Sequence, residues 1–153
     1  MTYEQFIDKR QAEFDKLPIF YAFDIKQFTA QLEMRNAKIS DVCSIGHGGY
    51  CLKKDKDIVL AFLNAPDELP ELMKDEEFAI DAFYYEMSNH EYQINHYQGN
   101  WDVLNCFADK ELKYIDADDY HVYLNEMGHP EWLPIYEKAR KKYLDDCDKN
   151  NWY

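Results

Sequence analysis

The sequence has few basic residues, and its central segment has almost none. The 153 residues include 17 Lys and Arg against 30 Asp and Glu, which gives a formal net charge of −13. Residues 66–131 hold 17 acidic residues and only three basic ones, whereas the two flanking segments are nearly neutral. A protein that binds nucleic acid directly needs a basic face, and an anionic membrane surface would repel this chain. We therefore expect neither a nucleic acid nor a membrane as a direct partner.

Long apolar runs and closely spaced cysteines are also absent. No stretch approaches the roughly 18 consecutive apolar residues of a transmembrane helix, and the first residues do not form a signal peptide. The four cysteines are far apart in the sequence, unlike those of a disulfide-rich secreted domain: Cys43, Cys51, Cys106 and Cys147. These absences predict a cytoplasmic protein with reduced thiols.

Apolar and aromatic residues are plentiful enough to form a core. Apolar residues make up 46% of the chain, a content that argues against disorder. They include 13 Tyr and three Trp, whose polar atoms need partners when they are buried. At this length we expect a single domain that spans residues 1–153.

Hydrophobic spacing and capping residues predict a mainly α (α+β) fold, a compact helical domain with one small β-hairpin or short sheet near 42–53. Thr2 and Gln5 form a capping box, and Asp24 is the N-cap of a second helix. Prolines 66 and 70 bracket a helical turn. Helices are predicted at 3–16, 25–36, 55–64, 75–92 (the longest and most central), 101–108 (capped by Asn100), 118–127 and 131–149. Short strands are predicted at 113–115 and, unless it is a buried linker, at 19–23.

The segment 42–53 has two β-prone runs around Gly46-His-Gly-Gly, which is typical of a hairpin. With a three-residue loop, Cys43 and Cys51 would lie opposite each other on neighbouring strands. They could form a disulfide or, with His47, bind a metal ion. Two ordinary strand residues are the favoured interpretation.

An unusual polar string follows the helix predicted at 75–92. Glu86 and His90 are one turn apart, so they share a helix face, and His96 could complete a Glu/His/His metal site. The favoured interpretation is structural, with Glu86, His90 and Asn95 bonding to the helix end and orienting Trp101. Cys106 is expected to be a buried, inert thiol. No catalytic residue, metal or cofactor is assigned. The alternative polar site comprises Glu86, Asn89, His90, Asn95, His96, Trp101 and Asp102.

The acidic residues gather in two clusters. The first contains Asp67, Glu68, Glu71, Asp75, Glu76, Glu77 and Asp81, and the second contains Asp116, Asp118 and Asp119. The ordinary interpretation is that they keep the protein soluble. The more specific interpretation is that carboxylates on a rigid surface imitate phosphates and compete for a basic groove on another protein. The ordinary interpretation of the basic cluster at residues 138–142 is a solvated helix face that pairs with Glu137 and Asp145, and the alternative is that it docks onto the protein's own acidic segment.

Four strings of the sequence resemble an uncharacterised family of small acidic proteins. They are Leu17-Pro-Ile-Phe-Tyr-Ala-Phe23, Gly48-Gly-Tyr50, Asn89-His-Glu-Tyr-x-x-Asn95 with Gly99-x-Trp-Asp102, and Asn151-Trp-Tyr153. The family is associated with phages, plasmids and conjugative elements of gut bacteria. The resemblance implies a context in which small acidic proteins often inhibit host defence, anti-CRISPR proteins among them. It assigns no activity to any residue.

Three functions therefore remain open. The leading hypothesis is a cytosolic, non-enzymatic interaction module that binds a basic protein surface, such as that of a nuclease or another nucleic-acid-binding effector. The alternative is a small enzyme or metal-binding protein centred on Glu86, His90, His96, Trp101 and Asp102. The third is an oligomeric structural domain, and the sequence does not predict the oligomeric state.

Overall fold

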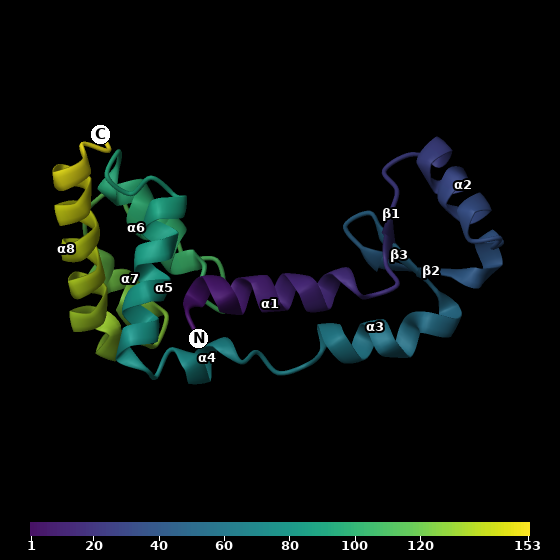
Figure 1. Cartoon of the computed structure of the whole chain (residues 1–153), viewed down its shortest axis with the longest axis horizontal. Helices are drawn as coiled ribbons and strands as arrows, with labels where there is room; N and C mark the ends of the chain where they lie inside the picture. Colours follow the sequence, from purple (N-terminus) through teal and green to yellow (C-terminus); the bar gives the residue numbers. More distant parts are fainter. The chain divides into compact units, whose positions relative to one another are not determined.

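The computed structural model describes all 153 residues and has the predicted mainly α (α+β) fold (Figure 1). The eight α-helices are α1 (Tyr3–Asp15), α2 (Ile25–Met34), α3 (Lys56–Leu63), α4 (Leu69–Leu72), α5 (Glu76–Asn89), α6 (His96–Asn105), α7 (Tyr120–Glu126) and α8 (Leu133–Asn150). The strands are β1 (Phe20–Tyr21), β2 (Val42–Gly46) and β3 (Gly49–Leu52). Single 3-10 turns occupy η1 (Ile39–Asp41), η2 (Lys53–Asp55) and η3 (Pro130–Trp132).

The contacts within the chain divide it into two compact units. Unit 1 comprises Met1–Asp8 and Glu68–Tyr153, and unit 2 comprises Lys9–Asp67. Helix α1 begins in unit 1 and ends in unit 2. The predicted capping box at the start of α1 is confirmed, because Thr2 and Gln5 exchange side-chain-to-backbone hydrogen bonds of 2.8 and 3.1 Å. The expectation of a single domain stays a prediction.

The core of unit 1 is built around α5, which packs along α8 (Figure 1). Phe83, at the middle of α5, is fully buried. Its ring meets those of Phe107, Trp132 and Tyr136 edge to face, with centroid separations of 5.0, 5.7 and 5.2 Å. Such aromatic pairs add directional stabilisation to the burial of apolar area. The predicted central position of this helix is therefore confirmed.

Unit 2 contains an antiparallel sheet of strand order β1-β3-β2. The turn between β2 and β3 has two central residues, His47 and Gly48, whose φ angles are +53° and +76°, as a type I′ turn requires. A bulge between Ser44 and Gly46 shifts the register by one residue. Cys43 and Cys51 consequently face each other, as the three-residue loop predicted, although the loop itself is shorter.

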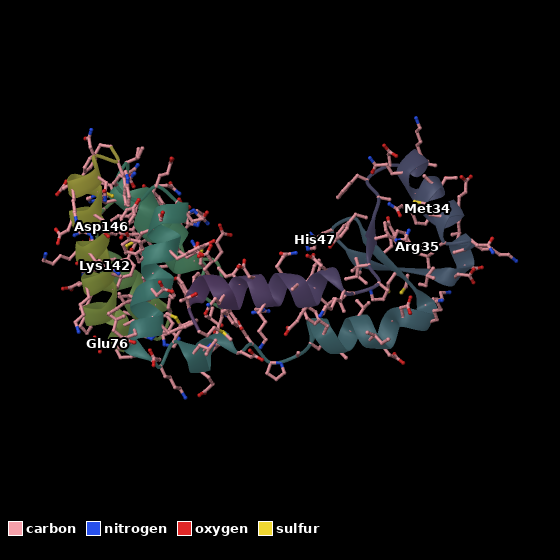
Figure 2. The ribbon with its side chains drawn as sticks, viewed as in Figure 1. Met34, Arg35, His47, Glu76, Lys142 and Asp146 are labelled. Carbon is pink, nitrogen blue, oxygen red and sulfur yellow. The ribbon has the colours of Figure 1, made fainter.

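Helix α2 of unit 2 is joined to the sheet by aromatic rings. Arg35 directly follows this helix (Figure 2). Its guanidinium lies 4.1 Å from the ring centroid of Phe20. Phe20 stacks on Tyr50 at 5.8 Å, and Phe28 of α2 contacts the same tyrosine ring at 5.0 Å. The predicted cap of α2 is also confirmed, because the Asp24 side chain accepts a 2.7 Å hydrogen bond from a first-turn N–H group.

Helix α5 ends three residues before the predicted boundary at residue 92. Glu91 adopts a left-handed conformation, with φ of +49°. The N–H of Tyr92 then bonds back to the carbonyl of Met87 at 3.0 Å, and the N–H of Glu91 bonds to the carbonyl of Ser88 at 3.3 Å. These two bonds form a Schellman motif, which terminates a helix. Glutamate, unlike glycine or asparagine, does not indicate a left-handed residue in a sequence, so the sequence does not predict this end of α5.

The helix predicted at 101–108 exists, but its predicted start and its cap, Asn100, are wrong. Helix α6 begins five residues earlier, at His96, and the side chain of Asn95 caps it by accepting two first-turn N–H groups at 3.0 and 3.2 Å. Gly99 and Asn100, which suggested a loop, are buried inside the helix. A Cβ at Gly99 would lie 2.6 Å from the ring of Tyr92, so the glycine permits close packing.

The predicted strand at 113–115 does not form. Side chains satisfy the backbone of this region instead: the indole of Trp101 donates to the carbonyl of Leu112 at 2.6 Å, and the N–H of Ile115 donates to the hydroxyl of Tyr123 at 2.7 Å. With these partners the segment needs no neighbouring strand.

Helix α8 is the longest helix, at 18 residues, so the expectation that the helix near 75–92 would be longest is wrong. Pro134 lies in its first turn, as predicted. Lys142 and Asp146 lie one turn apart on α8 (Figure 2), and both contact Tyr84: the ammonium lies 4.9 Å from the ring centroid, and the carboxylate accepts its hydroxyl at 2.7 Å. No helix of the protein combines the length and the hydrophobicity needed to cross a bilayer.

Candidate functional site

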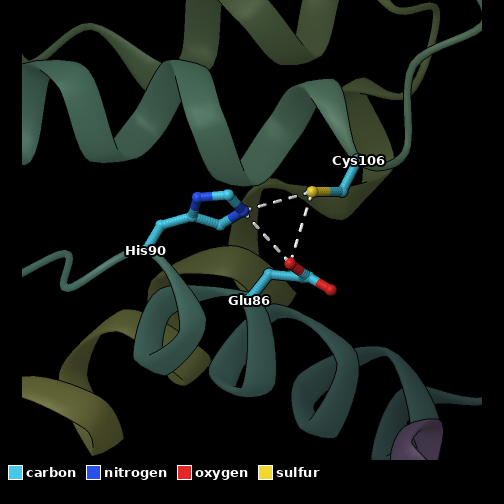
Figure 3. A group of neighbouring side chains, drawn as sticks. All are labelled: Glu86, His90 and Cys106. Carbon is cyan, nitrogen blue, oxygen red and sulfur yellow. Dashed lines mark hydrogen bonds and ion pairs between the residues drawn. The ribbon is translucent and has the colours of Figure 1, made fainter. Parts of the chain in front are cut away.

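Three side chains with ligand-forming atoms meet where α5 and α6 end (Figure 3). Glu86 lies in the last turn of α5, His90 is the C-cap of that helix, and Cys106 is the C-cap of α6. Oε2 of Glu86 is 3.3 Å from Nε2 of His90 and 3.3 Å from Sγ of Cys106. The sulfur is 3.7 Å from the same imidazole nitrogen. We call these three residues the Glu86 cluster.

Other side chains hold the Glu86 carboxylate in place. Only 5% of the residue is exposed. Its second oxygen, Oε1, accepts a 3.0 Å hydrogen bond from the hydroxyl of Tyr3, and Nδ2 of Asn89 lies 3.4 Å from Oε2. Burial and the nearby Glu86 charge raise the pKa of Tyr3, so this hydroxyl stays a donor at neutral pH.

Cys106 differs from its sequence-based expectation, because the residue is exposed rather than buried. Desolvation of its sulfur, followed by the negative charge of Glu86, raises the pKa of the thiol to about 12. A thiol with this pKa is protonated at neutral pH and is a poor nucleophile. The cluster also lacks the relay of a catalytic triad, in which one imidazole nitrogen faces the nucleophile and the other faces the acid. In this structure Nε2 of His90 faces both Cys106 and Glu86.

His96, the third member of the predicted metal site, has different partners. Its ring stacks on Tyr92 at a centroid distance of 4.9 Å, and its Nδ1 lies 3.2 Å from Nη2 of Arg140. Desolvation and the positive charge of Arg140 lower the pKa of this histidine from its ordinary value of 6.5. The structure therefore brings Glu86 and His90 together with Cys106, a cysteine that sequence spacing did not connect to them.

The remaining members of the polar string have structural contacts. Asn95 caps α6, and Trp101 is oriented by the carbonyl of Leu112 rather than by Glu86, His90 or Asn95. The Asp102 carboxylate accepts a 3.1 Å hydrogen bond from the side chain of Gln98.

Several residues of the acidic clusters are engaged within the protein. Four of them form ion pairs, which are Asp67 with Arg10, Glu71 with Lys74, Glu76 with Lys138, and Asp118 with Arg140. Asp75 accepts a 2.9 Å hydrogen bond from the N–H of Phe78 and so caps α5. Lys138 and Arg140 of the basic cluster thus pair with the acidic segment of the same chain, whereas Lys141 pairs with Asp145 on α8 itself.

A cleft of about 420 Å³ in unit 1 is lined by part of the first acidic cluster. Its lining combines four carboxylates with apolar and small side chains: Glu71, Asp75, Glu77, Asp81, Met1, Thr2, Leu72 and Phe78. No lysine or arginine side chain is among these lining residues. Asp81 also accepts a 2.8 Å hydrogen bond from the backbone N–H of Tyr3, which fixes one wall. We call this feature the acidic cleft.

Comparison with known proteins gives one family. The sequence profile of DUF7659, a family of unknown function, matches residues 2–120. The chain belongs to DUF7659. The part shared with the DUF7659 profile includes the Glu86 cluster and all residues of the acidic cleft except Met1, and it ends before α8. Membership of DUF7659 confirms that the chain belongs to an uncharacterised family. No curated protein and no solved structure matches the chain.

Proposed function

We propose that this DUF7659 protein is an interaction module whose acidic cleft binds a basic segment of a partner protein. The observation that carries the proposal is the lining of the cleft, where four carboxylates surround apolar side chains such as Leu72 and Phe78. Only one of the four, Glu71, is paired with a basic side chain, that of the exposed Lys74. The proposed binding surface contains fewer acidic residues than the one predicted from the sequence, because ion pairs within the chain already engage Glu76 and Asp118.

The cleft matches the chemistry of lysine and arginine side chains. Each has an apolar stem that can cover Leu72 or Phe78 and a charged head that can reach a carboxylate at the rim. The net charge of −13 would attract a basic partner at long range and speed the encounter. Binding of this kind weakens as salt screens the charges.

In its most specific form, the proposal makes the partner a nucleic-acid-binding effector, such as a host nuclease or another defence protein. The carboxylates would then occupy the groove that otherwise holds phosphates. In this form the protein would be encoded by a phage, plasmid or conjugative element. It would act in the reducing cytosol of the host, where its four free thiols would persist.

The test is capture of partners from a bacterial lysate by the immobilised full chain, at low and at high salt, with mass spectrometry of the bound proteins. The variant E71K/E77K reverses two carboxylates of the cleft but spares Asp75 and Asp81, which have structural hydrogen bonds. We expect it to lose the salt-sensitive partner while its circular dichroism spectrum is unchanged.

The matched control is E111K/E126K, which changes the net charge equally at two exposed positions that do not line the cleft. It should retain the partner. Equal capture by both variants, or a partner that resists high salt, would contradict the proposal.

A further inference from the structure

The Glu86 cluster has the features of a metal site, and this goes beyond the proposed docking function because it involves different residues. We propose that Glu86, His90 and Cys106 bind one divalent transition-metal ion, with zinc as the preferred ion. The ligand atoms of these three residues lie within 4.8 Å of one another and converge on one point (Figure 3).

The separations between the ligand atoms agree with tetrahedral coordination. Zinc binds sulfur at about 2.3 Å and nitrogen or oxygen at about 2.0–2.2 Å, so ligand atoms of one tetrahedral ion lie about 3.3–3.6 Å apart. The three observed separations are 3.3 Å from Glu86 to His90, 3.3 Å from Glu86 to Cys106, and 3.7 Å from His90 to Cys106. An ion could therefore enter with little movement of the side chains.

The surrounding backbone also favours a cation. His90 and Cys106 are the C-caps of α5 and α6, so the negative ends of two helix dipoles meet at the cluster. The charge of the Glu86 carboxylate adds to them, and Asp102 is a further acidic group that acts on the Cys106 thiol. A divalent cation would neutralise this concentration of negative potential.

The cluster has both the support and the access that a metal site needs. Tyr3 donates to the carboxylate oxygen of Glu86 that faces away from the other two ligands, which fixes the carboxylate orientation. The side chain of His90 is 31% exposed, and Cys106 is exposed, so an ion can enter from solvent. Three protein ligands leave a fourth position for water, as in zinc sites of enzymes.

The choice of zinc follows from the ligand types. Thiolate and imidazole prefer zinc and neighbouring transition metals, whereas magnesium and calcium prefer oxygen ligands. On binding, the ion forms a bond to the Cys106 sulfur and displaces the thiol proton to solvent. The rival interpretation is a hydrogen-bonded cluster of thiol, carboxylate and imidazole that has no affinity for metal.

Cobalt(II) is the appropriate probe because it replaces zinc in tetrahedral sites and its absorption reports the ligands. Titration of the metal-free, reduced full chain should give visible bands of four-coordinate cobalt and a near-ultraviolet sulfur-to-cobalt band, both saturating at one equivalent. One equivalent of Zn²⁺ should abolish both bands. A wild-type protein that gives neither band would overturn the proposal.

Variants assign the bands to the cluster. C106S should lose the sulfur-to-cobalt band, and H90Q should weaken cobalt binding at least tenfold. H90Q changes a partly exposed side chain, so it keeps the test valid if C106S does not fold. The controls C43S and H96Q alter a thiol and a histidine outside the cluster and should titrate as wild type. A sulfur band that survives in C106S, or that disappears in C43S instead, would refute the assignment.

The hydrogen bond from Tyr3 allows a second, milder test. Y3F removes the donor to Glu86 and no metal ligand, and loss of such outer contacts typically lowers metal affinity about 10–100-fold. We expect the cobalt spectrum to keep its shape while the dissociation constant rises about tenfold. Unchanged affinity would show that the Tyr3 hydrogen bond does not support the metal-binding carboxylate. E71K/E77K should not alter the titration, which separates this proposal from the docking function.

Discussion

Asn100 donates a hydrogen bond from its side-chain amide to a carboxylate oxygen of Asp118, 2.6 Å away. The other oxygen of Asp118 accepts from Arg140 at 2.8 Å. Asn100 is fully buried, and its Oδ1 accepts the hydroxyls of Tyr92 and Tyr136, each at 2.7 Å. One amide thus connects α6, α8 and the second acidic cluster. Asp118 therefore stabilises the fold of unit 1, whatever role its neighbours have in binding.

The buried amide predicts a large stability effect. N100A would leave the hydroxyls of Tyr92 and Tyr136 without their acceptor in the core, and unsatisfied buried polar groups cost about 1–3 kcal/mol each. We expect the free energy of unfolding, measured by urea denaturation, to fall by about 3 kcal/mol. N125A, at an exposed position of α7, is the control and should change it by less than about 0.5 kcal/mol. Equal effects would show that the network adds little stability.

The two neighbouring aspartates of the second acidic cluster should differ. D118A removes an ion pair with Arg140 and an acceptor for Asn100, so we expect a loss of about 1–2 kcal/mol in unfolding free energy. Asp119 is exposed and forms no side-chain cap on α7, so D119A should be nearly neutral. Thermal or urea unfolding of both variants decides this. If D118A leaves the unfolding free energy unchanged, Asp118 has no structural role and remains a candidate docking residue.

Local signals in the sequence predicted much of the fold. Capping side chains such as Thr2 and Asp24 gave correct helix starts, because a cap acts on backbone groups only two or three residues away. The pairing of Cys43 with Cys51 was predicted for a similar reason, since a short turn fixes the register of a hairpin. These features depend on a few consecutive residues, which a sequence displays directly.

The missed features depend on contacts between distant residues. Asn95 and Asn100 are both plausible caps, and only the burial of Asn100 against Tyr92 and Tyr136 decides between them. Cys106 joins Glu86 because α5 and α6 end at the same place, and no spacing rule reports where two helices meet. The sequence thus indicated two residues of the Glu86 cluster, which share one helix, and missed the third.

The left-handed residue at the end of α5 predicts a stabilising substitution. Glu91 has φ of +49°, a conformation that costs an ordinary residue about 1–2 kcal/mol and glycine much less. Glycine loses part of this gain through its greater freedom in the unfolded chain. E91G should therefore raise the unfolding free energy by about 0.5–1 kcal/mol. E91A removes the same charge but keeps a Cβ, so it should not stabilise the protein. A destabilised E91G would contradict the Schellman assignment.

The environment of His96 predicts how stability depends on pH. Desolvation and Arg140 lower the pKa of His96 in the folded protein below 6.5, whereas in the unfolded chain it returns to about 6.5. Between these values the unfolded state binds more protons, so the unfolding free energy should fall as the pH is lowered from 7.5 toward 5.5. H96Q should flatten this dependence, measured by urea unfolding at several pH values.

A direct measurement of His96 separates its titration from other groups. An NMR titration of its ring proton should give a pKa below 6.5, and R140M should raise that value because the repelling guanidinium is gone. The nearby Asp118 acts in the opposite direction, so D118N should lower the pKa further. If the pKa is 6.5 or higher in the wild type, desolvation and Arg140 do not control this histidine. The unfolding free energy should then show no His96-dependent fall between pH 7.5 and 5.5.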